Sequence, residues 1–188
     1  MAERCGARVV FEKRKGYGSA CGKAISIVRN PDILLFLNAD GAEKLSEAPL
    51  LVNEVIQGAD MVVGSRQLGR CEKGSLYFHQ KLGNRFCIAL INKIWGTQFT
   101  DLGPFRAVDY KKFMNLNLVD KDFGWIVKMQ LSAIENGMVI KEIATTTKPS
   151  YSHSKISGSF SASLKSGFTM ISTILYFAVL KYRKILSQ

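Results

Sequence analysis

The chain has 188 residues, enough for one domain with a sizeable core, and 47% of them are hydrophobic. Its formal net charge of +11 favours an anionic partner: nucleic acid, an anionic membrane surface or a phosphorylated substrate. Nucleic acid is disfavoured, because the chain has no basic helix, zinc-ligand spacing or ribonucleoprotein motif. Four widely separated cysteines without a CxxC pair predict reduced, non-catalytic thiols in a cytoplasmic protein, and the polar start at 1–6 predicts no signal peptide.

The predicted elements of the first part of the chain alternate between strands and helices. In chain order they are a strand at 9–12, a helix at 19–29, a strand at 33–37, a helix at 46–56 and a strand at 60–64. The strand at 33–37 is apolar throughout, which is typical of a strand buried on both faces of a parallel sheet. This alternation predicts the α/β class, with a mostly parallel sheet flanked by helices.

The second part of the chain is richer in helix. In chain order we predict a helix at 79–95, a turn-rich segment at 100–106, a helix at 123–136, a strand at 139–143, a polar loop at 145–160 and a C-terminal helix. The longest apolar stretch, 167–180, is too short to span a bilayer as an ordinary helix. Basic residues flank it at Lys165 and 181–184, so this helix either lies in a membrane interface, which we favour, or packs on the domain.

Two loops have residues suited to a diphosphate and its metal ion. The segment 38–41, Asn-Ala-Asp-Gly, directly follows the strand predicted at 33–37, and ligands of parallel sheets bind where strands end. Asp40 is therefore placed to hold a divalent cation, although Asn38 and Asp40 are also ordinary turn formers. The loop 153–159 is rich in serine, glycine and lysine, which suits diphosphate oxygens but is equally typical of a flexible loop.

Two further loops carry arginine. Arg66 follows a predicted strand in the segment Gly-Ser-Arg and is either a bidentate phosphate ligand or a surface arginine. Asp101 and Arg106 flank a rigid Gly-Pro turn, which would hold both side chains in fixed directions. The alternative for this second pair is a structural salt bridge.

These loops belong to an ordered series of short motifs. In chain order the series is GYGSAC at 16–21, FLNADG at 36–41, VGSR at 63–66, HQ at 79–80 with GN at 83–84, TDLGPFRA at 100–107, FGW at 123–125, MQ at 129–130 and SKISG at 154–158. The series resembles the family 2 glycosyltransferases of the polyprenyl-phosphate type, the dolichol-phosphate mannosyl- and glucosyltransferase group. GYGSAC looks like the family's GYGxA segment, and FLNADG looks like its FLDxDG metal motif. The resemblance covers essentially the whole chain.

The resemblance implies a fold, a reaction and a location. The fold would be GT-A-like, with a partial glycosyltransferase domain over 1–160 and an amphipathic, membrane-interfacial helix over 161–188. The reaction would be inverting transfer of a hexose from a nucleotide diphosphate sugar to a polyprenyl phosphate, in the synthesis of cell-envelope glycan. An acceptor phosphate is already anionic, so the reaction needs no strong general base and depends on positioning and on stabilising the departing diphosphate. The enzyme would lie in the cytoplasm, peripheral to the membrane.

The resemblance also implies roles for particular residues. Asp40 and Asn38 would hold Mg²⁺ or Mn²⁺ on the donor diphosphate. The other implied donor contacts are Gly16, Tyr17, Ser154 and Lys155. Arg66 and Arg85 would meet the acceptor phosphate, and the residues implied for catalysis are Asp101, Arg66 and Arg106.

The chain also departs from the family pattern. The family's first strands, which contact the nucleotide, are absent before Val9. Asn38 replaces a carboxylate and brings no charge to a metal ion, which lowers the expected metal affinity. Ser150, Ser152 and Lys128 stand where the family usually has arginine, glycine and glutamate. The alternative to an enzyme is therefore a shortened, inactive relative that acts as a binding or assembly partner.

The absent strands predict an interaction as well. The strand expected at 9–12 would form the edge of the sheet, and its unpaired backbone groups would invite another chain. We therefore expect either a homo-oligomer or pairing with a separate N-terminal fragment.

Overall fold

The computed structural model describes residues 2–118, 124–150 and 160–187. Its central sheet has the strand order β1-β3-β2-β4. The strands are β1 (Ile33–Phe36), β2 (Met61–Cys71), β3 (Arg106–Asp109) and β4 (Ile140–Thr147). β3 is antiparallel to both of its neighbours, whereas β2 and β4 are parallel. The expected α/β class is therefore confirmed. The sheet is mixed: β1, β2 and β4 run in one direction and β3 runs against them, so only β2 and β4 are parallel neighbours.

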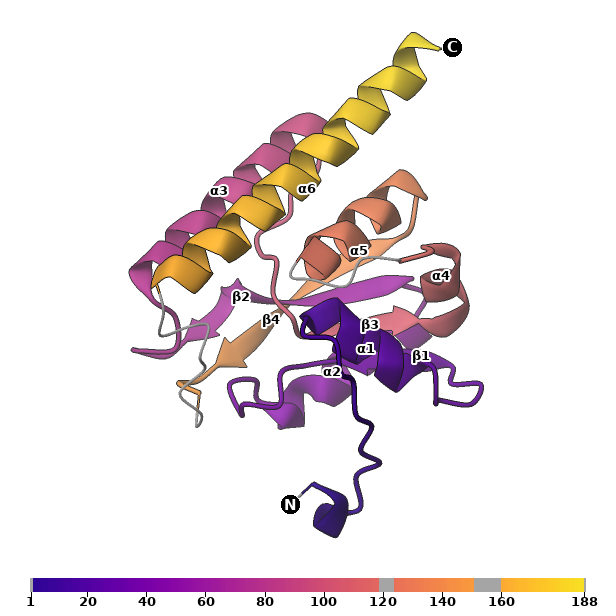
Figure 1. Cartoon of the computed structure of the whole chain (residues 1–188), viewed down its shortest axis with the longest axis vertical. Helices are drawn as coiled ribbons and strands as arrows, with labels where there is room; N and C mark the ends of the chain where they lie inside the picture. The colour runs from indigo at the N-terminus through magenta and orange to yellow at the C-terminus, as the bar shows by residue number, and fades with distance from the viewer. Residues whose placement is uncertain (1, 119–123, 151–159, 188) are drawn as a thin grey trace.

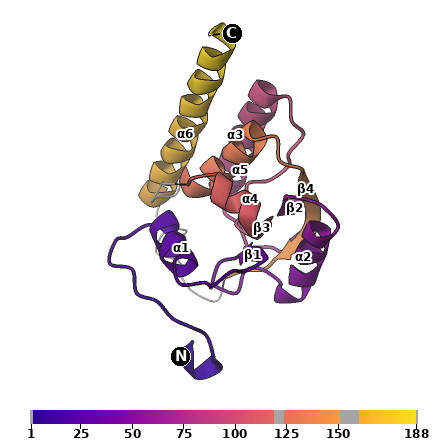
Figure 2. The ribbon, with the colours of Figure 1, turned by 90° about the vertical axis from the view of Figure 1, so that its right-hand side faces the viewer.

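Helices cover both faces of this sheet (Figures 1 and 2). The helices, in chain order, are α1 (Tyr17–Ile25), α2 (Ala48–Ile56), α3 (Phe78–Trp95), α4 (Tyr110–Asn115), α5 (Gly124–Glu135) and α6 (Phe160–Leu186), with short 3₁₀ turns η1 (Glu3–Cys5) and η2 (Leu45–Glu47). α2 packs on one face, where its Leu51 and Val55 meet Val62 and Ala107. α1, α4 and α5 pack on the other face.

The alternation of side chains along the strands explains why both faces are apolar. Leu34 and Phe36 of β1 belong to the core under α4 and α5, whereas Ile33 and Leu35 pack with the α2 side. Trp125 of α5 is the centre of the first core, since its ring lies 5.2 Å from that of Phe36. The predicted strand is therefore confirmed for β1, with Leu34 and Phe36 buried on one face and Ile33 and Leu35 half-buried on the other.

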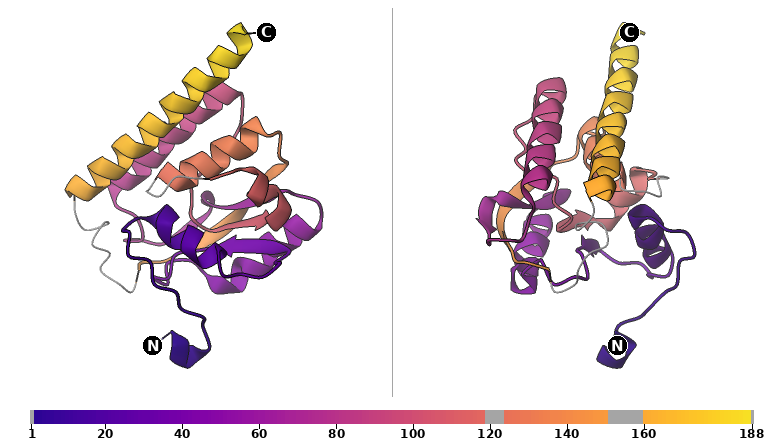
Figure 3. Two further views of the ribbon diagram at one scale, coloured as in Figure 1. Left: turned by 45° about the vertical axis from the view of Figure 1, so that its right-hand side comes forward. Right: turned by 60° about the vertical axis from the view of Figure 1, so that its left-hand side comes forward.

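α6 forms an outer layer with α3 and α5, beyond the sheet (Figures 1 and 3). Its buried Ile174 packs with Ile91 of α3 and Leu131 of α5. The Lys181 ammonium donates a 2.8 Å hydrogen bond to the Ile94 carbonyl at the end of α3. The C-terminal helix thus packs on the domain through one face. In the described parts of the chain, no helix has both the length and the apolarity needed to cross a membrane.

Some of the predicted elements differ from the structure. The prediction of a strand at 9–12 is wrong. This segment has no regular secondary structure, and the Phe11 side chain is 92% exposed. β-Forming residues need a partner strand, and this segment extends away from the sheet instead (Figure 1). Among the described residues, the edge of the sheet on that side is β1. Pairing with a second copy or a separate N-terminal segment stays a prediction, now for the edge of β1.

Other differences concern where elements end. β2 was expected to end at residue 64 but continues to Cys71, with a break in its register against β4 between Ser65 and Arg70. The antiparallel strand β3 and the short helix α4 were not predicted. β3 has only four residues, too few to give a periodic signal that separates it from the preceding turn.

Candidate functional site

Arg66 and Asp101 form a bidentate ion pair. The Arg66 Nε and Nη2 groups donate to the two Asp101 carboxylate oxygens, each at 2.7 Å, and the Arg66 backbone N–H donates to Oδ2 at 2.9 Å. The Asp101 side chain is 0% exposed and that of Arg66 is 17% exposed. Burial disfavours the Asp101 carboxylate, but its hydrogen bonds from Arg66 outweigh this and hold the pKa of Asp101 below its usual range.

The loop that carries Asp101 is fixed from several sides. Glu142 of β4 accepts hydrogen bonds from the backbone N–H groups of Thr100 and Asp101 at about 3 Å. Asn84 of α3 accepts from the Leu102 N–H at 3.1 Å. Gly103 lies so close to β2 that an added Cβ would approach the Gly64 carbonyl to 2.9 Å. The loop is therefore rigid, and it presents Asp101 to Arg66 in a single direction.

Arg106 lies in the core rather than at a surface. It is 1% exposed and donates to the Gly103 carbonyl at 2.7 Å, the Ile126 carbonyl at 3.1 Å and the Gln130 Oε1 at 2.8 Å. Burial lowers its pKa to about 10. The structure thus places Arg106 behind the Asp101 loop, which it joins to α5.

Asp40 and its neighbours occupy the turn after β1. The Asp40 Oδ1 accepts from the Ala42 N–H at 3.1 Å, and the Asp40 carbonyl accepts from the Ser150 hydroxyl at 3.4 Å. Asn38 and Asp40 are both half-buried. Glu43 follows in the same turn and is buried, and burial raises its pKa to about 6. Within the residues that the structure describes, no group of three or more His, Cys, Asp or Glu side chains forms a metal site.

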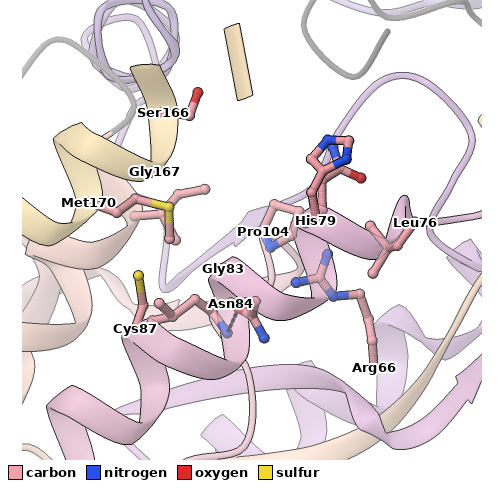
Figure 4. Close-up of a pocket in the computed structure, with 13 residues that line it drawn as sticks. Arg66, Leu76, His79, Gly83, Asn84, Cys87, Pro104, Ser166, Gly167 and Met170 are labelled. Atoms are coloured by element: carbon pink, nitrogen blue, oxygen red, sulfur yellow. Dashed lines mark hydrogen bonds between the residues drawn. The ribbon is translucent and has the colours of Figure 1, made fainter. Parts of the chain in front are cut away.

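A cavity of about 260 Å³ opens between α3, α6 and the Asp101 loop (Figure 4). Arg66, His79, Gln80 and Asn84 line it with polar groups. Its remaining walls are largely apolar: Leu76, Cys87, Leu102, Pro104, Ile126 and Met170, with Gly83, Ser166 and Gly167 between them. Arg66 therefore connects the ion pair to an apolar cavity, a role that its sequence motif alone did not indicate.

The structure brings together some of the expected site residues and separates others. Tyr17 packs edge-on against Trp125 at 5.8 Å, and burial raises its pKa above the usual range. Gly16 precedes it as the N-cap of α1. Arg85 is exposed on α3 and does not line the cavity beside Arg66. Ser154 and Lys155 lie outside the described residues.

Three residues at the site were missed by sequence reasoning alone. Glu142 fixes the Asp101 loop, Asn84 supports Leu102, and Glu43 lies buried beside Asp40. The motif at 83–84 already contained Asn84, although without a role. Glu142 lies in strand β4, and nothing in the sequence around it indicates a contact with the Asp101 loop.

The chain is similar in sequence to curated glycosyltransferases. It is 27% identical over 150 residues to glycosyltransferase AglJ of Haloferax volcanii, a match that covers 79% of this chain and 49% of AglJ. It is 28% identical over 172 residues to an uncharacterised glycosyltransferase of Mycobacterium tuberculosis, with 87% of this chain and 74% of the relative covered. The chain thus spans about half the length of AglJ. No family model matches the chain.

Solved structures show the same fold at lower sequence identity. Glucosyl-3-phosphoglycerate synthase of Mycobacterium tuberculosis, crystallised with Mn²⁺, UDP-glucose and phosphoglyceric acid, superposes with a TM-score of 0.71 at 16% identity. The match covers 94% of this chain and 62% of the synthase. The same synthase with phosphoglyceric acid alone also gives a TM-score of 0.71. The chain therefore has a GT-A-like glycosyltransferase fold and is related in sequence to glycosyltransferases.

Proposed function

We propose that the chain transfers a hexose from a nucleotide diphosphate sugar to a polyprenyl phosphate at the cytoplasmic surface of a membrane, with Mg²⁺ or Mn²⁺ as its metal ion. The observation that carries the proposal is the position of Asp40. It follows the end of β1 in a GT-A-like fold, and a structural neighbour with this fold was crystallised with Mn²⁺ and UDP-glucose. Sequence relatives that are themselves glycosyltransferases support the same reaction class.

The residues after β1 fit a hard divalent cation. Asp40 offers a half-buried carboxylate and Asn38 an amide oxygen, and both are oxygen ligands of the kind that Mg²⁺ and Mn²⁺ prefer. The metal ion would neutralise charge on the departing diphosphate. The protein's own contribution would be to hold the donor and acceptor in line.

Arg66 is suited to hold the acceptor phosphate. Its Nε and Nη2 groups already donate to Asp101, so the planar guanidinium is fixed in orientation before any ligand binds. The remaining N–H groups of Arg66 suit phosphate oxygens, and the residue lines the cavity. The phosphate is already a nucleophile, so the site needs no strong base.

The apolar walls of the cavity favour a lipid acceptor over a small polar one. Leu76, Leu102 and Met170 would contact hydrocarbon next to the phosphate-binding Arg66. The helices that form this cavity also expose apolar side chains to solvent. On α3 these are Phe78, Leu82 and Phe86, and on α6 they are Phe168, Leu175, Val179 and Leu186. A membrane that covers these helices would deliver its lipid at the mouth of the cavity.

The donor site is tested by calorimetry of UDP-glucose and GDP-mannose, with and without Mn²⁺. We expect metal-dependent binding of one donor, and we expect Asp40→Ala to weaken it by about tenfold or more, because the cation loses a charged ligand. Asp32→Ala is the matched control, since Asp32 is an exposed carboxylate before β1. The affinity of the Asp32→Ala variant for the donor should equal that of the wild type.

Two results would contradict the proposal. If the donor binds the Asp40→Ala variant as tightly as the wild type, the donor does not bind at the turn after β1. Failure of both donors to bind would favour the alternative function, an inactive relative that binds or assembles, which the uncharged Asn38 already favours. Turnover with a polyprenyl phosphate is the next assay after metal-dependent binding.

The membrane surface is tested by sedimentation with vesicles of phosphatidylglycerol and phosphatidylcholine. We expect the protein to bind the anionic vesicles, more weakly at high salt because its net charge is +11. The double variant Leu175→Ser/Val179→Ser should lower the partition coefficient by about tenfold or more, because each half-exposed side chain stabilises insertion by about 0.7 kcal/mol or more. Leu45→Ser, at an exposed leucine in η2, is the control and should bind as the wild type does. Equal binding by the α6 double variant would exclude this surface.

A further inference from the structure

Glu43 is a buried carboxylate with an unused oxygen. Glu43 is 8% exposed, and its Oε2 atom has no hydrogen-bond partner in the parts of the chain that the structure describes. A buried carboxylate oxygen without a partner is costly, because the protein does not replace the water that it loses. Such a group suggests that a partner is supplied from outside the chain.

The backbone around Glu43 is held in place. Glu43 forms an isolated antiparallel bridge with Thr147 at the end of β4. The neighbouring Ala42 carbonyl accepts from the Lys148 N–H at 2.8 Å. The turn after β1 is thus anchored to β4, so the backbone at Glu43 is held by two segments.

The surroundings of Glu43 are those of the candidate donor site. Burial raises the pKa of Glu43 most, the negative charge of Asp40 raises it further, and the backbone N–H groups of Glu43 and Asn38 and the charge of Arg66 lower it. Glu43 lies three positions after Asp40 in the turn that follows β1, and its carboxylate is buried. In the described residues it forms no ion pair with Arg66, whose fork is directed to Asp101.

We propose that Glu43 supplies the second carboxylate for the divalent cation and so replaces the charge that Asn38 lacks. The inference rests on the proposed function. With Asn38 and Asp40 alone, a cation would meet one carboxylate and one neutral amide oxygen. With Glu43 it meets two carboxylates, and the cation in turn provides the missing partner for Oε2. The chain would thereby keep a charged metal site despite the asparagine at position 38.

The test measures Mn²⁺ binding, with and without UDP, from the electron paramagnetic resonance signal of free Mn²⁺. Glu43→Gln keeps the shape of the side chain and removes its charge, and we expect it to weaken Mn²⁺ binding by about tenfold or more. Glu54→Gln is the matched control, because Glu54 forms an exposed pair with Lys141 and should leave the affinity unchanged. The double variant Asn38→Asp/Glu43→Gln should restore affinity to within about threefold of the wild type, a rescue that a purely structural role of Glu43 would not produce.

The remaining outcomes separate this inference from the proposed function. If Glu43→Gln binds Mn²⁺ as the wild type does, the inference is wrong and the donor site stands. If the wild type binds no Mn²⁺, both are wrong. The single variant Asn38→Asp decides the matter even if Glu43→Gln does not fold. It should strengthen binding by less than about threefold if Glu43 already provides the charge, and an increase of about tenfold or more would overturn the inference.

Discussion

Asp101→Ala is expected to lower the free energy of unfolding by about 3–5 kcal/mol, as measured by urea denaturation. The reason is the charge that the substitution leaves behind. Arg66 keeps a guanidinium that is 17% exposed, and it loses both carboxylate oxygens that its Nε and Nη2 groups contact. The Leu102 N–H also loses its 2.8 Å bond to Asp101 Oδ1. Removing one partner of a buried pair is far more costly than removing an exposed pair.

The control is Lys141→Ala, which breaks the exposed pair between Lys141 and Glu54 and should cost no more than about 1 kcal/mol. The pH dependence gives a second check. Because the folded-state pKa of Asp101 is lowered, its stabilising effect is complete above the unfolded-state value of about 3.9 and is lost as the pH falls through the folded-state pKa. The stability of the wild type should therefore approach that of the variant in acid. A constant difference from pH 7 to pH 2 would show that the ion pair is not its cause.

Arg106→Ala is the second substitution with a large expected effect, again about 3–5 kcal/mol of unfolding free energy. It opens a cavity in the core and removes the guanidinium donor from the Gly103 carbonyl and the Gln130 Oε1, and from the Ile126 carbonyl within α5. Arg106→Lys should have an intermediate effect, because one ammonium group does not reproduce the directions of the guanidinium fork. Thermal and urea denaturation measure both variants.

The matched control is Arg70→Ala, at an exposed arginine of β2, which should change stability by less than about 0.5 kcal/mol. The comparison also tests the role implied by the family resemblance, in which Arg106 takes part in catalysis. A variant at Arg106 that is as stable as the wild type but has lost transferase turnover would show that this residue acts on the substrate. We expect the opposite, a loss of stability with turnover retained in the fraction that remains folded.

The sequence predicts the elements that have a strong local signal. The apolar run before Asn38, the broad apolar face of α3 and the helix at α5 are all found close to their expected bounds. The segment at 9–12 has equally suitable residues for a strand, but a strand forms only against a partner, which local sequence does not contain. β3 was missed for the converse reason, because its four residues are ordered by two neighbouring strands rather than by their own pattern.

The site follows the same rule. Short sequence motifs contain three of the candidate site residues, Asp40, Arg66 and Asp101. The residue types and their spacing in these motifs are enough to identify them as candidates. Their roles depend on contacts between distant segments: Arg66 is paired with Asp101, 35 positions later, and Glu142 fixes the same loop from β4. Arg106 is the clearest case, since its motif favoured a site residue or a salt bridge, whereas the side chain is buried and donates to Ile126 and Gln130 of α5. Burial of this kind is a property of packing that no motif encodes.

The antiparallel strand β3 has a consequence for the size of the ligand. Since it lies between β1 and β2, the turn that carries Asp40 and the strand that carries Arg66 are two inter-strand spacings apart, or about 10 Å. The row Phe36, Arg106 and Val63 crosses the sheet at this level. A single small anion does not span this width, whereas an extended molecule with a charged group at each end does. Under the proposed function, the single strand β3 sets the distance between the two charged ends of a ligand that contacts both Asp40 and Arg66.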